Sequence, residues 1–272
     1  FDLRTSMYKS VLTLMIIGLF PMAVLAQEAS TWSVHTNFET RTSLEAPERN
    51  DRNLTTSLDL IIGNKVSDSE RFIFRIIGNK ELTNQQEASL SNSYFGYSNK
   101  FFRPNDELYV SGELRAYLPT NKDSRQVESL QTRAYGAFRT SYSLSQMELS
   151  NVTLAWKISG FRNIQEFKRN SEGNPNTAFG LGNLFSVDIG VTEKVSFSTY
   201  IVNSQRWDHQ NIRKGDTFEF GNALSYQVES NIGLEFGHTI GGNTFKANGV
   251  DNNIKIFNKD DSTIYTTLQY SF

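Results

Sequence analysis

Apolar and polar residues alternate with a period of two along most of the chain beyond residue 30. The clearest segment is 32–39, in which Trp32, Val34 and Phe38 lie on one face and Glu39 on the other. Successive side chains of a strand point to opposite faces, so this period predicts a β-strand with one apolar and one polar face. A chain built from such segments is expected to be all-β.

Twelve segments of this kind are present, and each predicts one strand. They span residues 32–39, 54–62, 71–76, 90–98, 108–118, 130–138, 152–158, 185–191, 195–201, 218–226, 232–236 and 264–272. The fourth segment is the weakest, because Asn92 and Phe95 interrupt its alternation.

The connections between the segments alternate between long and short. The long ones are residues 44–52, 80–87, 119–127, 161–176, 204–216 and 242–261, and the tightest short ones are 192–194 and 229–230. An even number of strands with short turns at one end and long loops at the other is typical of transmembrane barrels, although the connection 99–106 is longer than that pattern expects. A soluble sandwich or barrel with an apolar core would show about the same alternation, with its apolar face turned inward.

Residues 1–26 predict an upstream extension and a cleavable signal peptide. Lys9 precedes the uncharged run Val11–Leu25, and Ala26 ends a site of the kind that signal peptidases cleave. The run is shorter than the about 20 residues that a spanning helix needs. No cysteine follows it, which excludes an N-terminal lipid anchor. We therefore expect residues 27–272 to form the folded domain.

The chain ends in an alternating segment that finishes on an aromatic residue. Ile264, Leu268, Tyr270 and Phe272 share its apolar face. This ending resembles the closing strand of bacterial outer-membrane β-barrels, whose terminal Phe is read by the barrel-assembly machinery. The resemblance implies a transmembrane antiparallel up-and-down β-barrel of about twelve strands in the outer membrane, in contact with outer-membrane lipid and lipopolysaccharide. A closed barrel is also what a bilayer requires, because residues 27–272 contain no apolar run long enough for a spanning helix.

Charge and composition exclude several functions. The net charge of −2 at pH 7 argues against a nucleic-acid partner, which would need a basic face. The three histidines, His35, His209 and His238, are dispersed and show no metal-ligand spacing. Residues 180–182 lack the helix and lysine of a phosphate loop, so no cofactor is expected.

The polar faces of the predicted strands carry charges that would line the lumen of a barrel. The basic group lies on the third to seventh segments and consists of Arg71, Arg75, Arg115, Arg133, Arg139 and Lys157. The acidic group on other segments includes Asp59, Glu219 and Glu235, and one acidic residue, Glu113, falls among the basic group. A barrel would place the two groups on roughly opposite walls. Wall charges select permeants by sign, which predicts a channel with a preference for anions.

Glu113 also supports a different interpretation, in which the lumen is filled. If the hairpin around it is symmetric about residue 123, Glu113 faces Arg133, and directly opposed charges stabilise a sheet. A barrel of this size lies between small barrels filled by side chains and wide porins filled by water. The sequence is therefore compatible with an open channel and with a plugged lumen.

Aromatic residues and outer loops complete the prediction. Aromatic residues near strand ends, including Phe161 and Phe218 toward the outside, suit the interfacial girdles of a membrane barrel. Among the long outer loops, residues 161–176 are the best candidate to fold into the mouth and narrow it.

The favoured function is a porin or channel for passive diffusion of small hydrophilic solutes. The alternative is a non-conducting structural or adhesin-like barrel that acts through its outer loops. Outer-membrane phospholipases pair a His and a Ser two residues apart on a lipid-facing strand, whereas His238 is followed by Thr239 and Ile240. No base and nucleophile pair is evident, and neither a phospholipase nor a protease is favoured.

Overall fold

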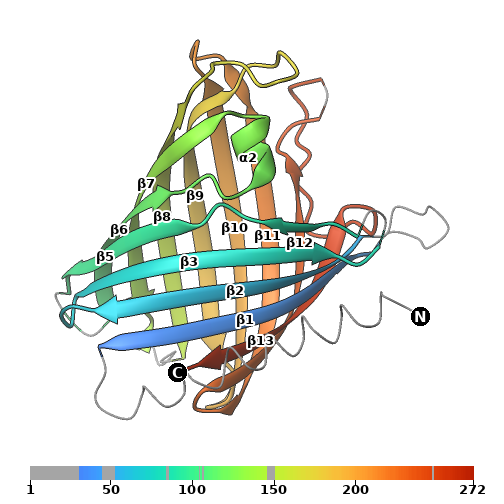
Figure 1. The fold of residues 1–272 in the computed structure, drawn as a ribbon. Coiled ribbons are helices and arrows are strands. Elements are labelled where there is room, and N and C mark those ends of the chain that lie inside the picture. Colours follow the sequence, from blue (N-terminus) through green and yellow to red (C-terminus); the bar gives the residue numbers. More distant parts are fainter. Residues whose placement is uncertain are drawn as a thin grey trace, which may run out of the picture.

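The structure is a computed structural model, and it describes residues 31–44, 53–83, 86–103, 105, 107–145, 151–246 and 248–272. Within these ranges the chain forms one closed antiparallel sheet (Figure 1). The predicted signal peptide, residues 1–26, lies outside the described residues. No helix in the described ranges is both long and apolar enough to cross a membrane.

The sheet is built from strands that pair with their neighbours in sequence, except that β4 and β5 both pair with β3. The strands are β1 (Trp32–Ser43), β2 (Leu54–Lys65), β3 (Glu70–Glu81), β4 (Ala88–Leu90), β5 (Tyr94–Phe102), β6 (Leu108–Tyr117), β7 (Leu130–Ser143), β8 (Val152–Gln165), β9 (Thr177–Gly190), β10 (Val195–Asp208), β11 (Arg213–Glu229), β12 (Ile232–Asn243) and β13 (Ser262–Ser271). One short helix, α2 (Lys122–Gln126), lies between β6 and β7.

The barrel closes between its first and last strands. β1 pairs with β2 on one side and with β13 on the other, so the sheet closes on itself. β4 and β5 follow one another along the same partner, β3, and together occupy one position. The barrel therefore has twelve strand positions, and the predicted all-β barrel of twelve strands is confirmed.

The apolar face of the strands points outward. Phe138 lies opposite Ile158, and Trp156 lies opposite Phe185, on neighbouring strands. All four side chains are exposed. A soluble sandwich or barrel would bury this face, and soluble monomers rarely expose an apolar surface so extensive. The exposed apolar face is the arrangement of a transmembrane barrel.

The weak fourth segment is a strand with an irregularity in its middle. Gly78 pairs with Leu90, but Arg75 pairs with Tyr94, so residues 91–93 carry one residue more than β3 does. An extra residue moves every later side chain to the other face. Leu90 therefore points outward and Tyr94 inward, which explains why the alternation breaks at this place.

The two ends of the barrel differ as predicted. Short connections such as 66–69, 191–194 and 230–231 share one end with both chain termini of the sheet, and longer ones such as 118–129 and 244–261 lie at the other. The strands β8 to β11 extend further than the sequence indicates, and the connection expected at 204–216 shrinks to 209–212. The ends of β10 and β11 at this connection are mostly polar on both faces, so no period of two marks them.

Candidate channel lumen

The barrel interior collects the charged residues that the sequence singles out. Each lies on the face opposite to the outward apolar side chains of its own strand. These residues are Asp59 on β2, Arg71 and Arg75 on β3, Glu113 and Arg115 on β6, Arg133 and Arg139 on β7, Lys157 on β8, Glu219 on β11 and Glu235 on β12. The strand register therefore directs all of these side chains into the lumen. Their ion-pair and cross-strand partners, however, differ from those predicted from the sequence.

Asp59 does not belong to the acidic group as expected. Its carboxylate accepts two hydrogen bonds from Arg75, at 2.8 Å from Nε and 2.7 Å from Nη2. Asp59 is buried, and it also accepts a bond from Asn37 at 3.3 Å. A bidentate pair of this kind satisfies both partners, so Arg75 contributes little net charge to the lumen.

The expected pairing of Glu113 with Arg133 is wrong. Glu113 lies opposite Ala137, and Arg133 lies opposite Tyr117. The hairpin is centred near residue 125 because the connection 118–129 includes α2, which a symmetric turn about residue 123 does not allow for. Glu113 instead accepts a hydrogen bond from Arg115 at 2.6 Å and lies 3.8 Å from Lys157.

Three of the inward arginines have no ion pair with a described carboxylate. Arg71 donates to the hydroxyl of Ser33 at 2.7 Å, and Arg133 donates to the amide oxygen of Asn163 at 2.7 Å. Arg139 is exposed to the lumen and lies directly opposite another cation, Lys157. These three positive charges on β3 and β7 are thus not held in ion pairs among the described residues.

Aromatic rings lie between these cations, and the sequence analysis missed them. The guanidinium of Arg115 lies 4.5 Å from the ring centre of Tyr94 and 4.9 Å from that of Tyr135. The guanidinium of Arg133 lies 4.7 Å from the ring of Phe161, which therefore faces the lumen and is not part of an outer girdle. Parity within their strands was the signal that could have found Tyr117, Tyr135 and Phe161, whereas the irregularity before β5 hides the inward position of Tyr94. We call this set the basic–aromatic wall: Arg71, Arg75, Tyr94, Arg115, Tyr117, Arg133, Tyr135, Arg139, Lys157 and Phe161.

The other side of the barrel holds carboxylates that accept hydrogen bonds from tyrosines. Tyr200 donates to Glu219 at 2.6 Å, and Tyr265 donates to Glu235 at 2.9 Å. Glu39 on β1 pairs with Arg41 at 3.0 Å. We call Glu39, Arg41, Tyr200, Glu219, Glu235 and Tyr265 the acidic wall.

Two glycines make room for the tyrosines of the acidic wall. Tyr200 lies directly opposite Gly221, and Tyr265 lies opposite Gly237. A Cβ atom at either glycine would clash with the tyrosine ring. These rings therefore lie flat across the inner surface, where their hydroxyl groups reach the carboxylates on neighbouring strands.

The strand order separates the two walls across the barrel. The basic–aromatic wall occupies β3 to β8, and the acidic wall occupies β10 to β13 and β1. In a closed barrel these strand groups face each other. Fixed charges of opposite sign on facing walls create a field across the lumen.

Comparisons with known proteins agree with this architecture. No family model matches the sequence, and no curated protein matches it. The COG4313 outer membrane channel from Pseudomonas putida F1 superposes with a TM-score of 0.60 and 10% identity over 89% of this chain and 96% of that chain. The NanC porin has a TM-score of 0.55 and 10% identity over 88% of this chain and 98% of that chain. The KdgM porin has a TM-score of 0.52 and 10% identity over 88% of this chain and 99% of that chain.

The fold is that of outer-membrane channel barrels. At 10% identity these similarities carry no residue roles from one protein to another. The chemistry of this barrel therefore rests on its own side chains.

Each of the three histidines contacts a polar side chain, and the ring of His35 lies 2.8 Å from the hydroxyl of Ser271. The ring of His238 lies 2.9 Å from the hydroxyl of Ser262, but Ser262 is fully buried and no substrate can reach it. His209 lies in the connection 209–212 and contacts Gln165. Partial burial and the nearby cations Arg162 and Lys168 lower the pKa of His209. Among the described residues, no group of three or more His, Asp or Glu side chains could hold a metal ion.

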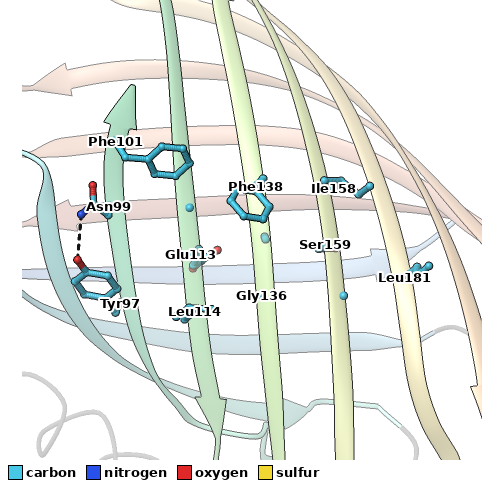
Figure 2. A pocket seen from close by; sticks show the side chains of 13 residues that line it. Tyr97, Asn99, Phe101, Glu113, Leu114, Gly136, Phe138, Ile158, Ser159 and Leu181 are labelled. Atoms are coloured by element: carbon cyan, nitrogen blue, oxygen red, sulfur yellow. Dashed lines mark hydrogen bonds between the residues drawn. The ribbon is translucent and has the colours of Figure 1, made fainter. Parts of the chain in front are cut away.

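A hollow of about 620 Å³ lies on the outer surface, behind the basic–aromatic wall (Figure 2). Its outward lining is mostly apolar and comes from β5 to β9. The glycines Gly136 and Gly160 lie opposite each other at its floor, between Leu114 and Leu181. Because this hollow faces away from the lumen, it is not part of a solute path.

Proposed function

We propose that the protein is a bacterial outer-membrane channel for passive diffusion of small hydrophilic solutes, with a preference for anions. The observation that carries the preference is the set of three inward arginines, Arg71, Arg133 and Arg139, without an ion pair to a described carboxylate. Wall charges that are not neutralised concentrate ions of the opposite sign.

The aromatic residues of the basic wall support the same proposal. A ring below a guanidinium holds it through its face and uses none of its N–H donors, so Arg133, which donates from Nε to Asn163, keeps further donors for another partner. Arginines held in this way present donors to a carboxylate or phosphate of a passing solute. The acidic wall differs, since its carboxylates already accept hydrogen bonds from tyrosines.

Planar-bilayer recordings of the purified protein under a salt gradient test both parts of the proposal. We expect discrete conductance and a reversal potential of the sign that corresponds to anion selectivity. A conducting but cation-selective barrel would contradict the preference. A barrel that inserts but never conducts would support the alternative of a plugged, structural or adhesin-like protein.

We also propose that the barrel-assembly machinery recognises the end of β13. Phe272 donates its N–H to the carbonyl of Val34 at 2.9 Å, so the last residue belongs to the seam that closes the barrel. The rings of Tyr270 and Phe272 lie edge to face with centres 4.4 Å apart. Deleting Phe272 is expected to reduce insertion while export continues, whereas Phe272→Tyr keeps an aromatic end and is the matched control. Normal levels of inserted protein after the deletion would contradict this role.

Location in the outer membrane is part of the same proposal. The exposed apolar face would contact lipid and lipopolysaccharide there. The protein is expected to require detergent and to migrate differently on gels before and after heating. A folded form that stays monomeric and soluble without detergent would overturn the location.

A further inference from the structure

The longest outer connection, residues 244–261, lies against the outside of the barrel. Thr244 accepts a hydrogen bond at 3.4 Å from Asn203, whose place in the register is on the outward face of β10. The ring of Phe257 lies 5.7 Å from that of His238, an outward residue of β12. Figure 1 shows the orange-red segment that follows β12 beside the barrel. The segment therefore covers the wall and not the mouth.

This segment buries outward-facing side chains near its end of the barrel. Phe218, Ile240 and Ser262 all lie on the outward face of their strands. All three are buried, although outward residues lower on the same strands are exposed. Phe218 is thus covered by the chain itself and is not a free girdle residue. The ring of His238 and the hydroxyl of Ser262 share a hydrogen bond beneath the segment.

The segment exposes apolar side chains of its own. Ile256 is 68% exposed and Phe257 is 64% exposed. The exposed set consists of Phe245, Val250, Ile254, Ile256 and Phe257. A connection in water is expected to present polar residues, and a cluster of exposed apolar residues marks a surface that contacts something else.

The exposed residues continue the apolar belt of the barrel. Phe236 is 56% exposed on the outward face of β12, two residues from His238. Two residues along a strand span about 7 Å, so Phe257 lies directly above the belt. Lys255 and Lys259 flank Ile256 and Phe257 in sequence. Apolar residues between lysines match the boundary between acyl chains and anionic headgroups.

Because Lys255 pairs with Asp261 at 3.2 Å, only Lys259 is assigned to headgroups. We propose that residues 244–246 and 248–261 form a membrane clip, in which Ile256 and Phe257 insert into the upper edge of the bilayer and Lys259 contacts anionic headgroups. The partner is the lipid surface around the barrel. This inference rests on the membrane location proposed above, and it assigns the longest outer loop to lipid and not to solute or to the channel mouth.

Single-cysteine labelling tests the clip, because the chain has no cysteine of its own. Phe257→Cys would be labelled with an environment-sensitive fluorophore and reconstituted in vesicles of phosphatidylcholine and phosphatidylglycerol that contain brominated acyl chains. Phe236→Cys is the control for the belt. Phe167→Cys, at a residue 58% exposed in another outer connection, is the control for water. Ile256→Cys repeats the test at a second position.

We expect brominated lipid to quench the label at residues 257 and 256, as at residue 236, and to leave the label at residue 167 bright. Quenching at residue 236 alone would overturn the clip while the membrane location stands. Quenching at neither position would overturn the location itself. A label at residue 257 shielded from both lipid and aqueous quenchers would show that protein, such as a second copy of the chain, covers the segment, and would also overturn the clip.

Discussion

The two charged walls of the lumen use aromatic residues in different proportions, since hydroxyl contacts to carboxylates dominate the acidic wall and ring contacts to cations dominate the basic–aromatic wall, with Arg41 over Tyr265 and the bond from Arg115 to the hydroxyl of Tyr117 as the exceptions. On the acidic wall, the hydroxyl groups of Tyr200 and Tyr265 donate to Glu219 and Glu235. On the basic–aromatic wall, cations lie over ring faces, as Arg115 does over Tyr94. The carboxylates are therefore engaged by the wall itself, whereas several guanidinium donors are not.

This difference means that counting charges does not predict the behaviour of the lumen. A phenol hydroxyl uses an acceptor position of a carboxylate, but a ring face uses none of the five N–H donors of an arginine. A solute anion can therefore find donors on the basic–aromatic wall. A solute cation meets carboxylates that already have partners.

The largest expected effect comes from removing the unpaired cations of the basic–aromatic wall. Replacing Arg71, Arg133 and Arg139 together with Gln should move the reversal potential from anion toward cation selectivity, because the acidic wall then dominates. The measurement is the reversal potential in a planar bilayer at low and high salt. The shift should shrink at 1 M salt, where the Debye length is about 3 Å.

A paired cation provides the control for that experiment. The double variant Asp59→Asn with Arg75→Gln removes one charge of each sign from a pair joined by two hydrogen bonds. Its selectivity should stay close to that of the unmodified protein. If the triple variant shifts no further than this double variant, the basic–aromatic wall does not determine selectivity.

The next largest effect concerns the stability of the two walls. Arg75→Gln alone leaves the buried carboxylate of Asp59 without its ion partner. Breaking a buried pair costs about 3–5 kcal/mol, and partial exposure of Arg75 reduces the expected loss to about 2 kcal/mol. On the acidic wall, Glu39 and Arg41 are more exposed, so Glu39→Gln should cost less than about 1 kcal/mol.

Urea unfolding followed by the heat-dependent gel shift measures both losses. Adding Asp59→Asn to Arg75→Gln should restore much of the lost stability. Equal losses on the two walls would show that burial does not distinguish the two ion pairs.

The faces of the strands could be predicted from sequence, whereas their partners could not. A period of two assigns Glu113 and Arg133 to the inward face whatever the register is. Their pairing depends on where the hairpin turns, and α2 moves that point by about two residues. The residues between β4 and β5 also could not be placed from the period alone, because one extra residue there reverses the inward and outward faces after Leu90.

The aromatic half of the lumen was missed for a different reason. Tyr94 lies after the irregularity, where alternation alone gives the wrong face. Phe161 has inward parity on β8, but an aromatic residue near a strand end also fits a membrane girdle. Sequence spacing cannot show that a ring lies beside a guanidinium on the next strand.

A smaller effect is expected from the glycines that distinguish the inner surface from the outer one. Gly237→Ala would place a methyl group against the ring of Tyr265 and force it away from Glu235. Overpacking of this kind should cost about 1–2 kcal/mol. Gly136→Ala, in the outer hollow, meets Leu114 at an ordinary distance of 3.6 Å and should change stability by less than about 0.5 kcal/mol.

Urea unfolding of the two variants side by side provides the measurement. If Gly136→Ala is the more damaging change, the outer hollow is more tightly packed than its open surface indicates. The assignment of tight packing to the acidic wall would then be wrong.

The smallest expected effect comes from removing one hydrogen bond to a carboxylate of the acidic wall. Tyr265→Phe removes the hydroxyl that donates to Glu235, which keeps a bond from Ser225 at 3.2 Å. The loss in stability should be about 0.5–1 kcal/mol. The anion preference should fall slightly, because the carboxylate can now attract cations.

Tyr135→Phe on the basic–aromatic wall is the matched control for that change. Tyr135 contacts Arg115 and Lys157 through its ring, at 4.9 Å and 5.6 Å, and the ring is kept in phenylalanine. The reversal potential should therefore shift with Tyr265→Phe and stay constant with Tyr135→Phe. Equal shifts in both variants would mean that tyrosine hydroxyl groups affect permeation in the same way on either wall, and the contrast between hydroxyl and ring contacts would not explain selectivity.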